Sequence, residues 1–581
     1  MININHKYVH PHEVVKNISR NDLKGAKVFL LNMPVREQAM PNNAPLGLSL
    51  LAAKLMQYDV QVVVIDLNSY RVFDEEAEKR GLDDGRVITF NEAKKIIHDH
   101  IDKYGDQDLI AMSGLITTLD WQKDVAKMVK ECQPDALLAS GGGLATEFRG
   151  ILFDWIPELN AVAHSEGDDV IVKLTYDAKQ FRNNSKILAT GGDNPYYLGE
   201  YKGVKRFLYD GGRPLDLDAI PFPAWHILEE DIYGNNILEQ YIRAPIWGTE
   251  AKNSSATPFT MNRSLNTVSS RGCPFACKFC FRGAQGERNY GVRSSGNIAK
   301  EVESFGEKYS LDFIGFVDDN FAVDRRRIAD LVENLGSVCR EHNIKWGTHA
   351  RLDECSDILK SNEESLKKRT SLRVDDMAKA GCVYIGFGAE SADKHVLEAM
   401  GKGGSTLRHG FRKINGHEFP VSMVEGVKNT FNSGIHSNCT WIMGYPTETL
   451  EHLKTSVAFI KWQEEMVCEG LKSNTEEYKK ALDSVNKQIF IATAYPGTEM
   501  FKDPKVHEAL SKRFSLSFDK TTNDPIPDEN MMNYVSKLND ASDVLYDEDN
   551  VPLYYGEMSP TEFTDVRDCI ENDNIFGILN L

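Results

Sequence analysis

Two stretches of this chain alternate short apolar runs with amphipathic helical patterns, and that alternation constrains the fold more than any other feature. In the first stretch, Val28–Leu31 is a continuous apolar run, as expected of a strand buried on both faces. Alternating strands and helices form a parallel sheet with right-handed crossovers. The predicted strands of this stretch are residues 28–31, 60–67, 109–114, 136–140 and 161–163. We therefore expect a doubly wound, Rossmann-like parallel sheet.

The alternation resumes at Thr267, with longer helices and six predicted strands. The first strand begins near Thr267, and the others are residues 313–317, 344–350, 383–387, 437–443 and 488–494. In α/β barrels the chemistry lies at the carboxyl ends of the strands, while the strand bodies form the core. The predicted fold class is therefore α/β, a Rossmann-like sheet followed by a partial (β/α)6 TIM-like barrel.

The domain organisation follows from these two stretches and the less regular segments around them. A length of 581 residues suits two to four domains. The connector and the last segment are rich in turn residues, and the last segment is also acidic. The predicted parts are an N-terminal arm (1–25), a Rossmann-like domain (26–180), a connector (181–265), a barrel (266–505) and a C-terminal extension (506–581).

Composition and charge exclude several classes of protein. A hydrophobic content of 41% with 26% charged residues is typical of a globular protein, and no apolar run approaches the roughly 18 residues needed for a membrane span. A net charge of -19 disfavours a dominant nucleic-acid-binding surface. The ten cysteines are too widely spread for a disulfide framework, which indicates a reducing compartment. With no signal-peptide pattern at the start, the predicted location is the cytoplasm.

Three cysteines, Cys273, Cys277 and Cys280, stand at C-x3-C-x2-C spacing just after the first barrel strand. Thiolates are soft ligands that suit iron–sulfur clusters or zinc. A structural zinc site and a simple electron-transfer cluster both normally take four protein ligands, and no fourth cysteine lies close by. Three ligands to a cubane cluster leave one iron open to bind a substrate, which indicates catalysis.

The cysteine spacing, with the aromatic Phe279 before the last cysteine, resembles the signature of the radical S-adenosylmethionine (radical SAM) enzymes. The preceding domain resembles the cobalamin-binding domain of the cobalamin-dependent branch of that family, in Pro45-x-Gly47-Leu48-x-x-Leu51-Ala52, the glycines after the fourth strand and Glu166-Gly167-Asp168. The chain departs from other cobalamin proteins in having no D-x-H-x-x-G segment. Any cobalamin would therefore lack that histidine ligand, and the lower axial position stays unassigned. The alternative is a degenerate domain that binds nothing or helps to hold substrate.

The resemblance, which covers roughly residues 26–505, implies a role for each matching residue. Cys273, Cys277 and Cys280 would be the metal ligands of a 4Fe–4S cluster. The implied S-adenosylmethionine contacts are Phe279, Asp318, Asp319, Arg351, Glu390, Ser391, Tyr445 and Pro446. The implied cobalamin-binding residues are Ser113, Thr117, Gly141, Gly142, Glu166 and Gly167. Structural roles are the alternatives for three of these: Asp319 as a cap of the following turn, Glu390 as a partner of Arg351, and Pro446 as a turn residue.

The resemblance also implies the reaction. A reduced cluster would cleave S-adenosylmethionine, the resulting 5'-deoxyadenosyl radical would take a hydrogen from an unactivated carbon, and methylcobalamin would deliver a methyl group to that carbon. The implied partners are a small-molecule or natural-product-like substrate and an electron donor such as flavodoxin or ferredoxin. We expect the open iron to face the carboxyl ends of the N-terminal sheet. Two alternatives stay open: oxidative cyclisation or ring rearrangement with the same cofactors, and a non-catalytic cofactor-binding accessory protein.

Overall fold

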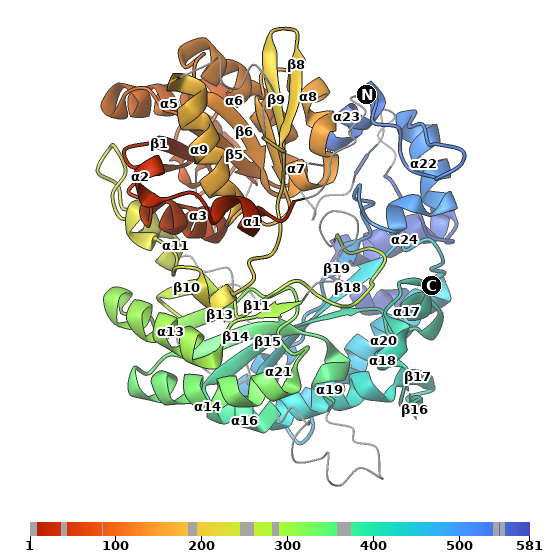
Figure 1. Ribbon diagram of the computed structural model, residues 1–581. Coiled ribbons are helices and arrows are strands. Elements are labelled where there is room, and N and C mark those ends of the chain that lie inside the picture. Colours follow the sequence, from red (N-terminus) through yellow and green to blue (C-terminus); the bar gives the residue numbers. More distant parts are fainter. Residues whose placement is uncertain are drawn as a thin grey trace. The chain divides into compact units, whose positions relative to one another are not determined.

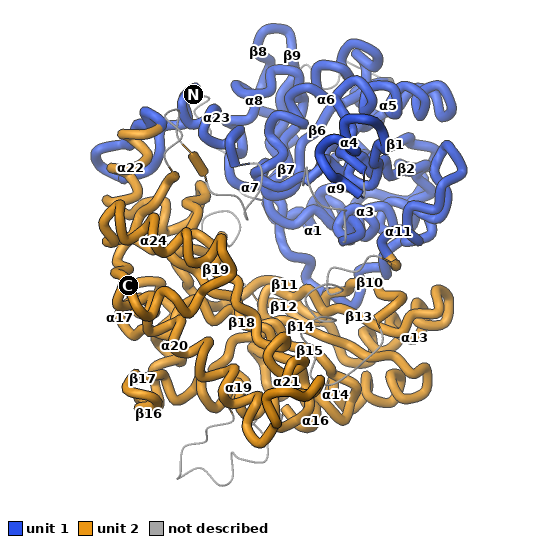
Figure 2. Tube along the Cα trace, turned by 180° about the vertical axis from the view of Figure 1, so that it is seen from behind, with its two compact units in different colours: residues 1–241, 283–286, 514–543 blue, residues 242–282, 287–513, 544–581 orange. Residues whose placement is uncertain are grey.

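Figure 1 shows the computed structural model, which describes residues 9–35, 43–83, 85–183, 194–243, 261–281, 290–356, 374–538, 545–546 and 552–581. The chain divides into two compact units, coloured separately in Figure 2. Unit 1 comprises residues 1–241, 283–286 and 514–543, and unit 2 comprises residues 242–282, 287–513 and 544–581. Unit 1 thus takes in most of the predicted connector and part of the predicted extension. The domain boundaries drawn from the sequence stay predictions.

Unit 1 is built on a seven-stranded sheet of order β2-β1-β5-β6-β7-β9-β8. Its first five strands confirm the predicted parallel sheet: β1 (Lys27–Asn32), β2 (Gln61–Asp66), β5 (Leu109–Gly114), β6 (Leu137–Gly141) and β7 (Ala161–His164). The strand order reverses between β1 and β5, because β2 lies on one side of β1 and all later strands lie on the other. Ligands of open α/β sheets bind at this kind of switch point, outside the carboxyl ends of the strands.

Two further strands of unit 1 lie in the segment that the sequence predicted as an irregular connector. β9 (Val204–Asp210) extends the sheet in parallel beside β7, and β8 (Tyr197–Tyr201) adds an antiparallel edge. The core of β9 contains only Phe207, Leu208 and Tyr209, preceded by two basic residues that suggest a loop. The structure accommodates Arg206 because its guanidinium donates to the carbonyl oxygens of Leu159 and Pro157.

Helices cover both faces of this sheet. α3 (Leu46–Met56) packs against α9 (Val170–Asn183), and α5 (Phe90–Tyr104) packs against α6 (Leu119–Cys132), as Figure 1 shows. α5 illustrates the local rules: Thr89 and Glu92 form a capping box at its start, and Gly105, with φ +73°, follows its last residue. In the predicted arm, α1 (Pro11–Val15) and α2 (Arg20–Leu23) also contact α9.

Unit 2 contains a six-stranded sheet of order β10-β13-β14-β15-β18-β19, in which every neighbouring pair is parallel. This confirms six strands in the predicted chain order, although β10 ends at Thr267, where the first strand was predicted to begin. Their bounds are β10 (Ser264–Thr267), β13 (Phe313–Phe316), β14 (Lys345–Ala350), β15 (Cys382–Glu390), β18 (His436–Met443) and β19 (Ile489–Ile491). A short antiparallel ribbon of β11 (Ser270–Arg271) and β12 (Gly291–Val292) follows β10.

Helices pack on one face of the six-stranded sheet. They include α13 (Ser295–Tyr309), α14 (Arg325–Glu341), α16 (Val374–Lys379), α19 (Val421–Asn432) and α20 (Leu450–Val467). The ring of Trp441 in β18 lies 5.6 Å from that of Phe459 in α20, and the indole of Trp346 in β14 donates to the Ala380 carbonyl after α16. Large buried aromatic side chains of this kind dominate the packing energy between sheet and helices.

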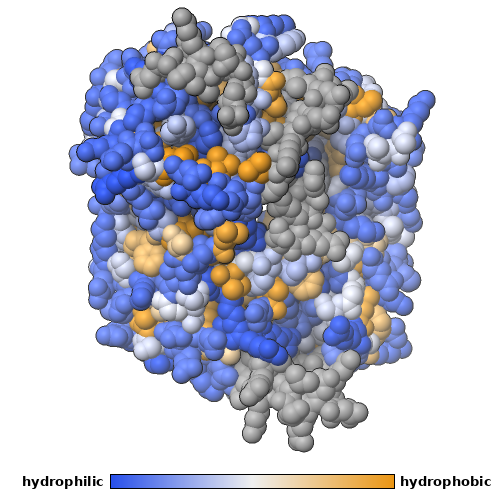
Figure 3. All heavy atoms as spheres, in the orientation of Figure 1, coloured by the Kyte–Doolittle hydropathy of each residue, from blue (hydrophilic) through white to orange (hydrophobic). Residues whose placement is uncertain are grey.

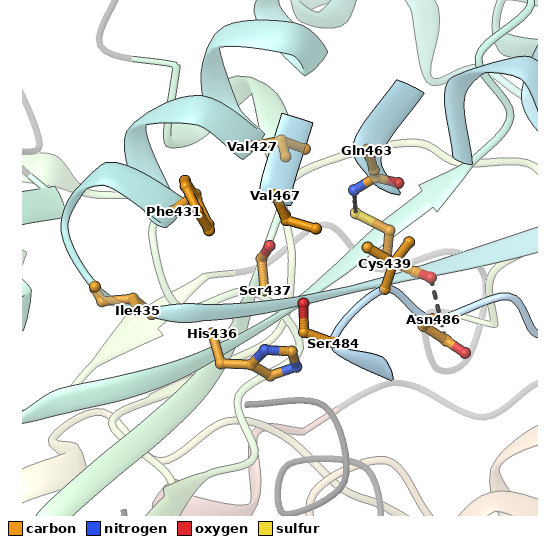
Figure 4. A pocket seen from close by; sticks show the side chains of 12 residues that line it. Val427, Phe431, Ile435, His436, Ser437, Cys439, Gln463, Val467, Ser484 and Asn486 are labelled. Atoms are coloured by element: carbon orange, nitrogen blue, oxygen red, sulfur yellow. Dashed lines mark hydrogen bonds between the residues drawn. The ribbon is translucent and has the colours of Figure 1, made fainter. Parts of the chain in front are cut away.

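A small cavity of about 40 Å³ lies at the amino end of β18, between α19, α20 and residues 484–486 (Figure 4). Figure 4 shows Phe431, Val467 and Gln463 around it, and the Gln463 amide donates to the Cys439 sulfur. A space of this size holds about one or two water molecules and no cofactor. It lies at the opposite end of the strand from the predicted site, so we assign it no role in catalysis.

The surface seen in Figure 3 is mostly hydrophilic, with hydrophobic residues in small scattered groups. Within the described parts of the chain, none of the helices has both the length and the apolar character needed to cross a bilayer.

Candidate active site

The cysteine loop, residues 272–280, follows β11 and is held by backbone hydrogen bonds to three separate segments of unit 2. The Gly272 amide donates to the Asp319 carboxylate after β13 (3.0 Å), and the Lys278 amide donates to the Met400 carbonyl (2.9 Å). The Met500 amide donates back to the Lys278 carbonyl (2.7 Å). Contacts from both ends therefore fix the loop beside the carboxyl ends of the barrel strands.

Within this loop, Cys273 and Cys277 are half-buried and Cys280 is exposed. Burial raises the pKa of the Cys273 thiol, and the nearby Cys277, Asp319 and Glu354 raise it further. Among the described side chains, no three cysteine, histidine or acidic groups are close enough together to hold a metal ion as they stand. The donor set itself, three thiols in one loop of otherwise non-ligating residues, fits an iron–sulfur cluster with one open iron.

Arg351 follows β14 and is almost fully buried against the cysteine loop. Its guanidinium carbon lies 4.3 Å from the centroid of the Phe275 ring, and Nη1 lies 3.8 Å from Cys277 Sγ. Nε donates to Asp353 (3.0 Å). Nη2 contacts acceptors in and beside α18 (Gly403–Thr406), namely Lys402 O, Ser405 Oγ and Thr406 Oγ1.

The two acidic residues after β13 have different environments. Asp318 is buried and accepts hydrogen bonds from the Ser269 amide (2.6 Å) and the Ser270 hydroxyl (2.7 Å), so its carboxylate ties β13 to the segment that leads into the cysteine loop. Burial nevertheless raises the pKa of Asp318. Asp319 is exposed and accepts from Gly272, the residue before Cys273. Their predicted contacts with S-adenosylmethionine stay predictions.

Glu390 ends β15 in a left-handed backbone conformation, with φ +63°, beside an irregularity in the pairing with β18. Its carboxylate forms a buried ion pair with Lys402 (3.0 Å), whereas Arg351 pairs with Asp353. The predicted alternative partner for Glu390 was therefore wrong. Ser391 is fully buried, with its hydroxyl 3.2 Å from that of Ser456 in α20. Non-glycine residues in the left-handed conformation of Glu390 are uncommon and often occur at functional sites.

The segment after β18 brings the predicted adenine-side residues next to the loop. The Tyr445 hydroxyl donates to the Ala399 carbonyl, close to the turn that holds Lys278. The Pro446 carbonyl accepts from Lys505. Phe279 is half-buried within the loop. Their roles toward S-adenosylmethionine also stay predictions, but all three lie in the loop or in the segment that follows a strand end.

The C-terminal extension, which the sequence predicted to cover the barrel or to form contacts, contributes residues at the end of β18. Tyr554 lies against Gly444, where an added Cβ would be 3.1 Å from the tyrosine ring, and the Glu557 amide donates to the Glu448 carbonyl. Glu448 is fully buried, accepts from the Gly444 amide (2.6 Å), and burial raises its pKa to about 8. The aromatic pair Tyr554-Tyr555 was the only signal in the sequence for this cover over the end of β18.

In unit 1, the predicted cobalamin residues lie at or after the carboxyl ends of β5, β6 and β7, and those of β5 border the switch point of the sheet. Ser113 lies near the end of β5, and Thr117 lies in the turn that follows. The Thr117 hydroxyl oxygen is buried and has no hydrogen-bond partner among the described residues. Leu115 exposes 54% of its surface beside it. An orphaned buried hydroxyl next to an exposed apolar side chain fits a site for a large ligand with both apolar and polar groups.

Gly141 ends β6, and Gly142 begins α7 (Gly142–Phe148) with φ +82°. A Cβ added to Gly142 would lie 2.7 Å from the Gly114 carbonyl oxygen, and Gly142 also bridges to Gly114 as a parallel pair. The close approach of two backbones therefore explains this glycine without any ligand. The same lack of side chains leaves the strand ends open to a flat cofactor.

The remaining two predicted residues lie after β7. Glu166 pairs with Arg213 (2.6 Å), and Gly167 lies against Leu51 of α3.

A buried network that the sequence prediction missed stands at the ends of β1 and β2. Asp66 accepts from Asn32 (2.8 Å) and from the Tyr241 hydroxyl (2.6 Å), and burial raises the pKa of Asp66.

Comparison with known proteins shows which proteins this chain is similar to. Residues 267–460 match the family model of the radical SAM superfamily. An uncharacterized methyltransferase of Pyrococcus horikoshii is 25% identical over 508 residues, which cover 86% of this chain and 87% of that protein. The anaerobic magnesium-protoporphyrin IX monomethyl ester cyclase of Cereibacter sphaeroides is 23% identical over 364 residues, which cover 62% of this chain and only 50% of the cyclase.

Among solved structures, the cobalamin-dependent S-adenosylmethionine radical enzyme OxsB, with aqua-cobalamin and S-adenosylmethionine bound, has a TM-score of 0.59 at 17% identity. The match covers 88% of this chain and 64% of OxsB, so it establishes the fold of both units. The radical SAM match covers the cysteine loop and four of the barrel strands that follow it. The chain thus matches the radical SAM superfamily over residues 267–460 and resembles cobalamin-dependent radical SAM enzymes in its fold.

Proposed function

We propose that this protein is a cobalamin-dependent radical SAM methyltransferase that adds a methyl group to an unactivated carbon of a small molecule. The observation that carries the proposal is the anchoring of three thiols, and no fourth, beside the carboxyl ends of a parallel barrel. A second sheet with a switch point supports the use of a second cofactor. The P. horikoshii methyltransferase, which resembles this chain over nearly its whole length, supports methylation as the outcome.

Cys273, Cys277 and Cys280 are the residues that would hold the 4Fe–4S cluster. With S-adenosylmethionine and cobalamin, the cluster supplies radical and methyl-transfer chemistry that no protein side chain provides. The protein's part is to fix the loop through Gly272, Lys278 and the amide of Met500. The C-terminal cover at Tyr554 excludes water from the end of β18, which protects a reactive site from side reactions.

In unit 1, Thr117 and Ser113 would orient the corrinoid by hydrogen bonds, and Gly141 and Gly142 would leave room for its ring. No D-x-H-x-x-G histidine is available to the cobalt in this sequence. The one-electron reductant that a radical SAM enzyme needs would come from a small electron-transfer protein such as flavodoxin or ferredoxin. All ten cysteines are free thiols, which supports a reducing compartment, and we place the enzyme in the cytoplasm.

The first test is cleavage of S-adenosylmethionine by the full-length protein, reconstituted anaerobically with iron and sulfide and supplied with a strong reductant. Wild type should form 5'-deoxyadenosine, and Cys277→Ala should form none, because a cluster with two thiolates does not assemble stably. Cys132→Ala is the matched control, since Cys132 is a half-buried thiol in α6 of unit 1 whose sulfur donates to backbone carbonyls of its own helix. Cleavage by Cys277→Ala at the wild-type rate would refute the proposal, and absence of cleavage by wild type would favour an accessory protein.

Oxidative cyclisation is the second candidate, because the similarity to the magnesium-protoporphyrin cyclase covers 62% of this chain. Product mass separates the two. Methylation adds one carbon and two hydrogens to the substrate, whereas oxidative ring closure removes hydrogen and adds no carbon. Deuterated methyl groups in S-adenosylmethionine should therefore appear in the product only if the enzyme is a methyltransferase.

A further inference from the structure

Arg351 has a contact set that goes beyond the ligand role suggested by its position after β14. Arg351 as a whole residue is 7% exposed. Nε donates to Asp353, and Nη2 contacts the Lys402 carbonyl (3.2 Å) and the Thr406 hydroxyl (3.1 Å). Most of its donors are therefore committed to protein acceptors. An arginine held in this way has little freedom to form the forked pair that recognises a carboxylate.

The remaining contacts of Arg351 point at the cysteine loop. The guanidinium stacks over Phe275, with 4.3 Å between the guanidinium carbon and the ring centroid, and Nη1 lies 3.8 Å from Cys277 Sγ. Phe275 and Cys277 are two residues apart in the segment between the first and second cysteines. Arg351 thus holds this segment through the ring of Phe275. It also brings a positive charge to one of the three cysteine sulfurs of the loop.

We propose that Arg351 is a positioning residue for the cluster, which fixes the loop between Cys273 and Cys277 and raises the reduction potential of the cluster through its contact with the Cys277 sulfur. Reduction adds a negative charge to the cluster, and a nearby cation or N–H donor stabilises the reduced form. The inference rests on the proposed function only in assuming that the three cysteines hold a cluster.

Asp353 complicates the charge argument, because it pairs with Arg351 and is itself buried. Removing the arginine alone would leave an unpaired carboxylate near the cluster, which would also lower the potential. Three variants separate these effects. Arg351→Lys keeps a cation but loses the fork and the stacking, Arg351→Gln removes the cation, and Arg351→Gln with Asp353→Asn removes both charges.

Arg206 supplies a matched control in unit 1. It is also buried, stacks over a phenylalanine (4.9 Å from the Phe153 centroid) and donates to the Leu159 and Pro157 carbonyls. Arg206→Lys should therefore lose the same kind of fork and stacking without any change near the cysteines. A fall in thermal stability common to Arg206→Lys and Arg351→Lys measures the general structural cost.

The experiment is a redox titration of the anaerobically reconstituted, full-length protein without S-adenosylmethionine or cobalamin, followed by electron paramagnetic resonance of the reduced cluster, with iron and sulfide content measured on the same samples. We expect a lower potential in Arg351→Lys, a still lower one in Arg351→Gln, partial return in the double variant, and the wild-type value in Arg206→Lys. If Arg351→Gln loses its cluster, Arg351→Lys and the double variant carry the test.

A wild-type potential in both Arg351→Lys and the double variant at full cluster content would overturn the inference. Weaker binding of S-adenosylmethionine with an unchanged potential would likewise overturn it and return Arg351 to a ligand role. The titration needs no S-adenosylmethionine, cobalamin or substrate. A protein that shows the expected shifts but transfers no methyl group would therefore contradict the proposed function alone.

Discussion

At the scale of single residues, side chains at the carboxyl ends of the barrel strands form more hydrogen bonds and ion pairs within the protein than the sequence predicts. Asp318, Glu390 and Arg351 were predicted as ligand contacts from their positions, and the structure finds each engaged with protein partners. Position after a strand is readable from sequence, because strand ends follow from apolar periodicity. Whether a side chain is bonded to another protein group depends on partners elsewhere in the chain, such as Lys402 for Glu390. No local sequence pattern predicts these partners.

The burial of Glu448 should make the stability of the folded protein depend on pH. Its pKa is raised from an ordinary 4.5 to about 8 by burial, so the folded protein keeps it protonated over a range in which the unfolded chain has lost the proton. The folded state then binds more protons than the unfolded state. Stability should therefore fall as the pH rises from about 4.5 to about 8, by roughly 1.4 kcal/mol per pH unit for this group, and the fall should end above that range.

Glu448→Gln removes this dependence while keeping an acceptor for the Gly444 amide. We expect the thermal midpoint of the variant to exceed that of wild type increasingly from pH 5 to pH 8, as measured by differential scanning fluorimetry of the full chain. Glu557→Gln, at an exposed residue of the same cover, is the control and should track wild type. A constant difference between Glu448→Gln and wild type across this range would show that the buried carboxylate does not titrate as expected.

At the scale of elements, the sequence predicted the strands that alternate with amphipathic helices and missed those that do not. All six barrel strands and the five parallel strands β1, β2, β5, β6 and β7 of unit 1 were predicted in chain order, since each is a short apolar run between turn residues. β8 and β9 follow residues 184–193, outside the described residues, and β9 opens with Lys205 and Arg206. The partners that make Arg206 compatible with a buried strand lie some 47 residues earlier in the chain.

Gly114 at the end of β5 and Gly142 at the start of α7 lie close together, and a substitution can test why both positions are glycine. Gly142→Ala should be strongly destabilising, because φ is +82° and the new Cβ would lie 2.7 Å from the Gly114 carbonyl oxygen. Gly234→Ala is a matched control, with φ +84° and open space around the added carbon. We expect a loss of about 1 kcal/mol for the control and roughly 2–4 kcal/mol for Gly142→Ala.

Thermal unfolding of the two variants, without cofactors, measures the difference. Gly142→Ala should in addition weaken corrinoid binding, since the shift of Gly114 moves the turn that holds Thr117. Equal destabilisation in the two variants would mean that the backbones separate easily, and that the glycines are needed only for their conformational freedom.

At the scale of the whole molecule, the chain consists of two compact units, each with its own core and its own candidate cofactor residues. The three thiols and their anchors all belong to unit 2, and the orphaned Thr117 hydroxyl and the switch point belong to unit 1. The expectation that the open iron faces the carboxyl ends of the N-terminal sheet stays a prediction. The candidate residues for the two cofactors therefore form two separate sets, one in each unit.

Independent loading of the two units is therefore the expected behaviour of the full chain. Replacing Cys273, Cys277 and Cys280 together by alanine should abolish iron–sulfur absorbance and leave bound corrinoid at the wild-type level. Thr117→Val, which removes the orphaned hydroxyl at nearly constant volume, should weaken corrinoid binding roughly tenfold, the effect of losing about one buried hydrogen bond. Thr175→Val is the control, because its hydroxyl bonds only within α9. Equilibrium dialysis with hydroxocobalamin, read alongside iron content, measures both cofactors, and loss of corrinoid in the triple cysteine variant would mean that the units load as one.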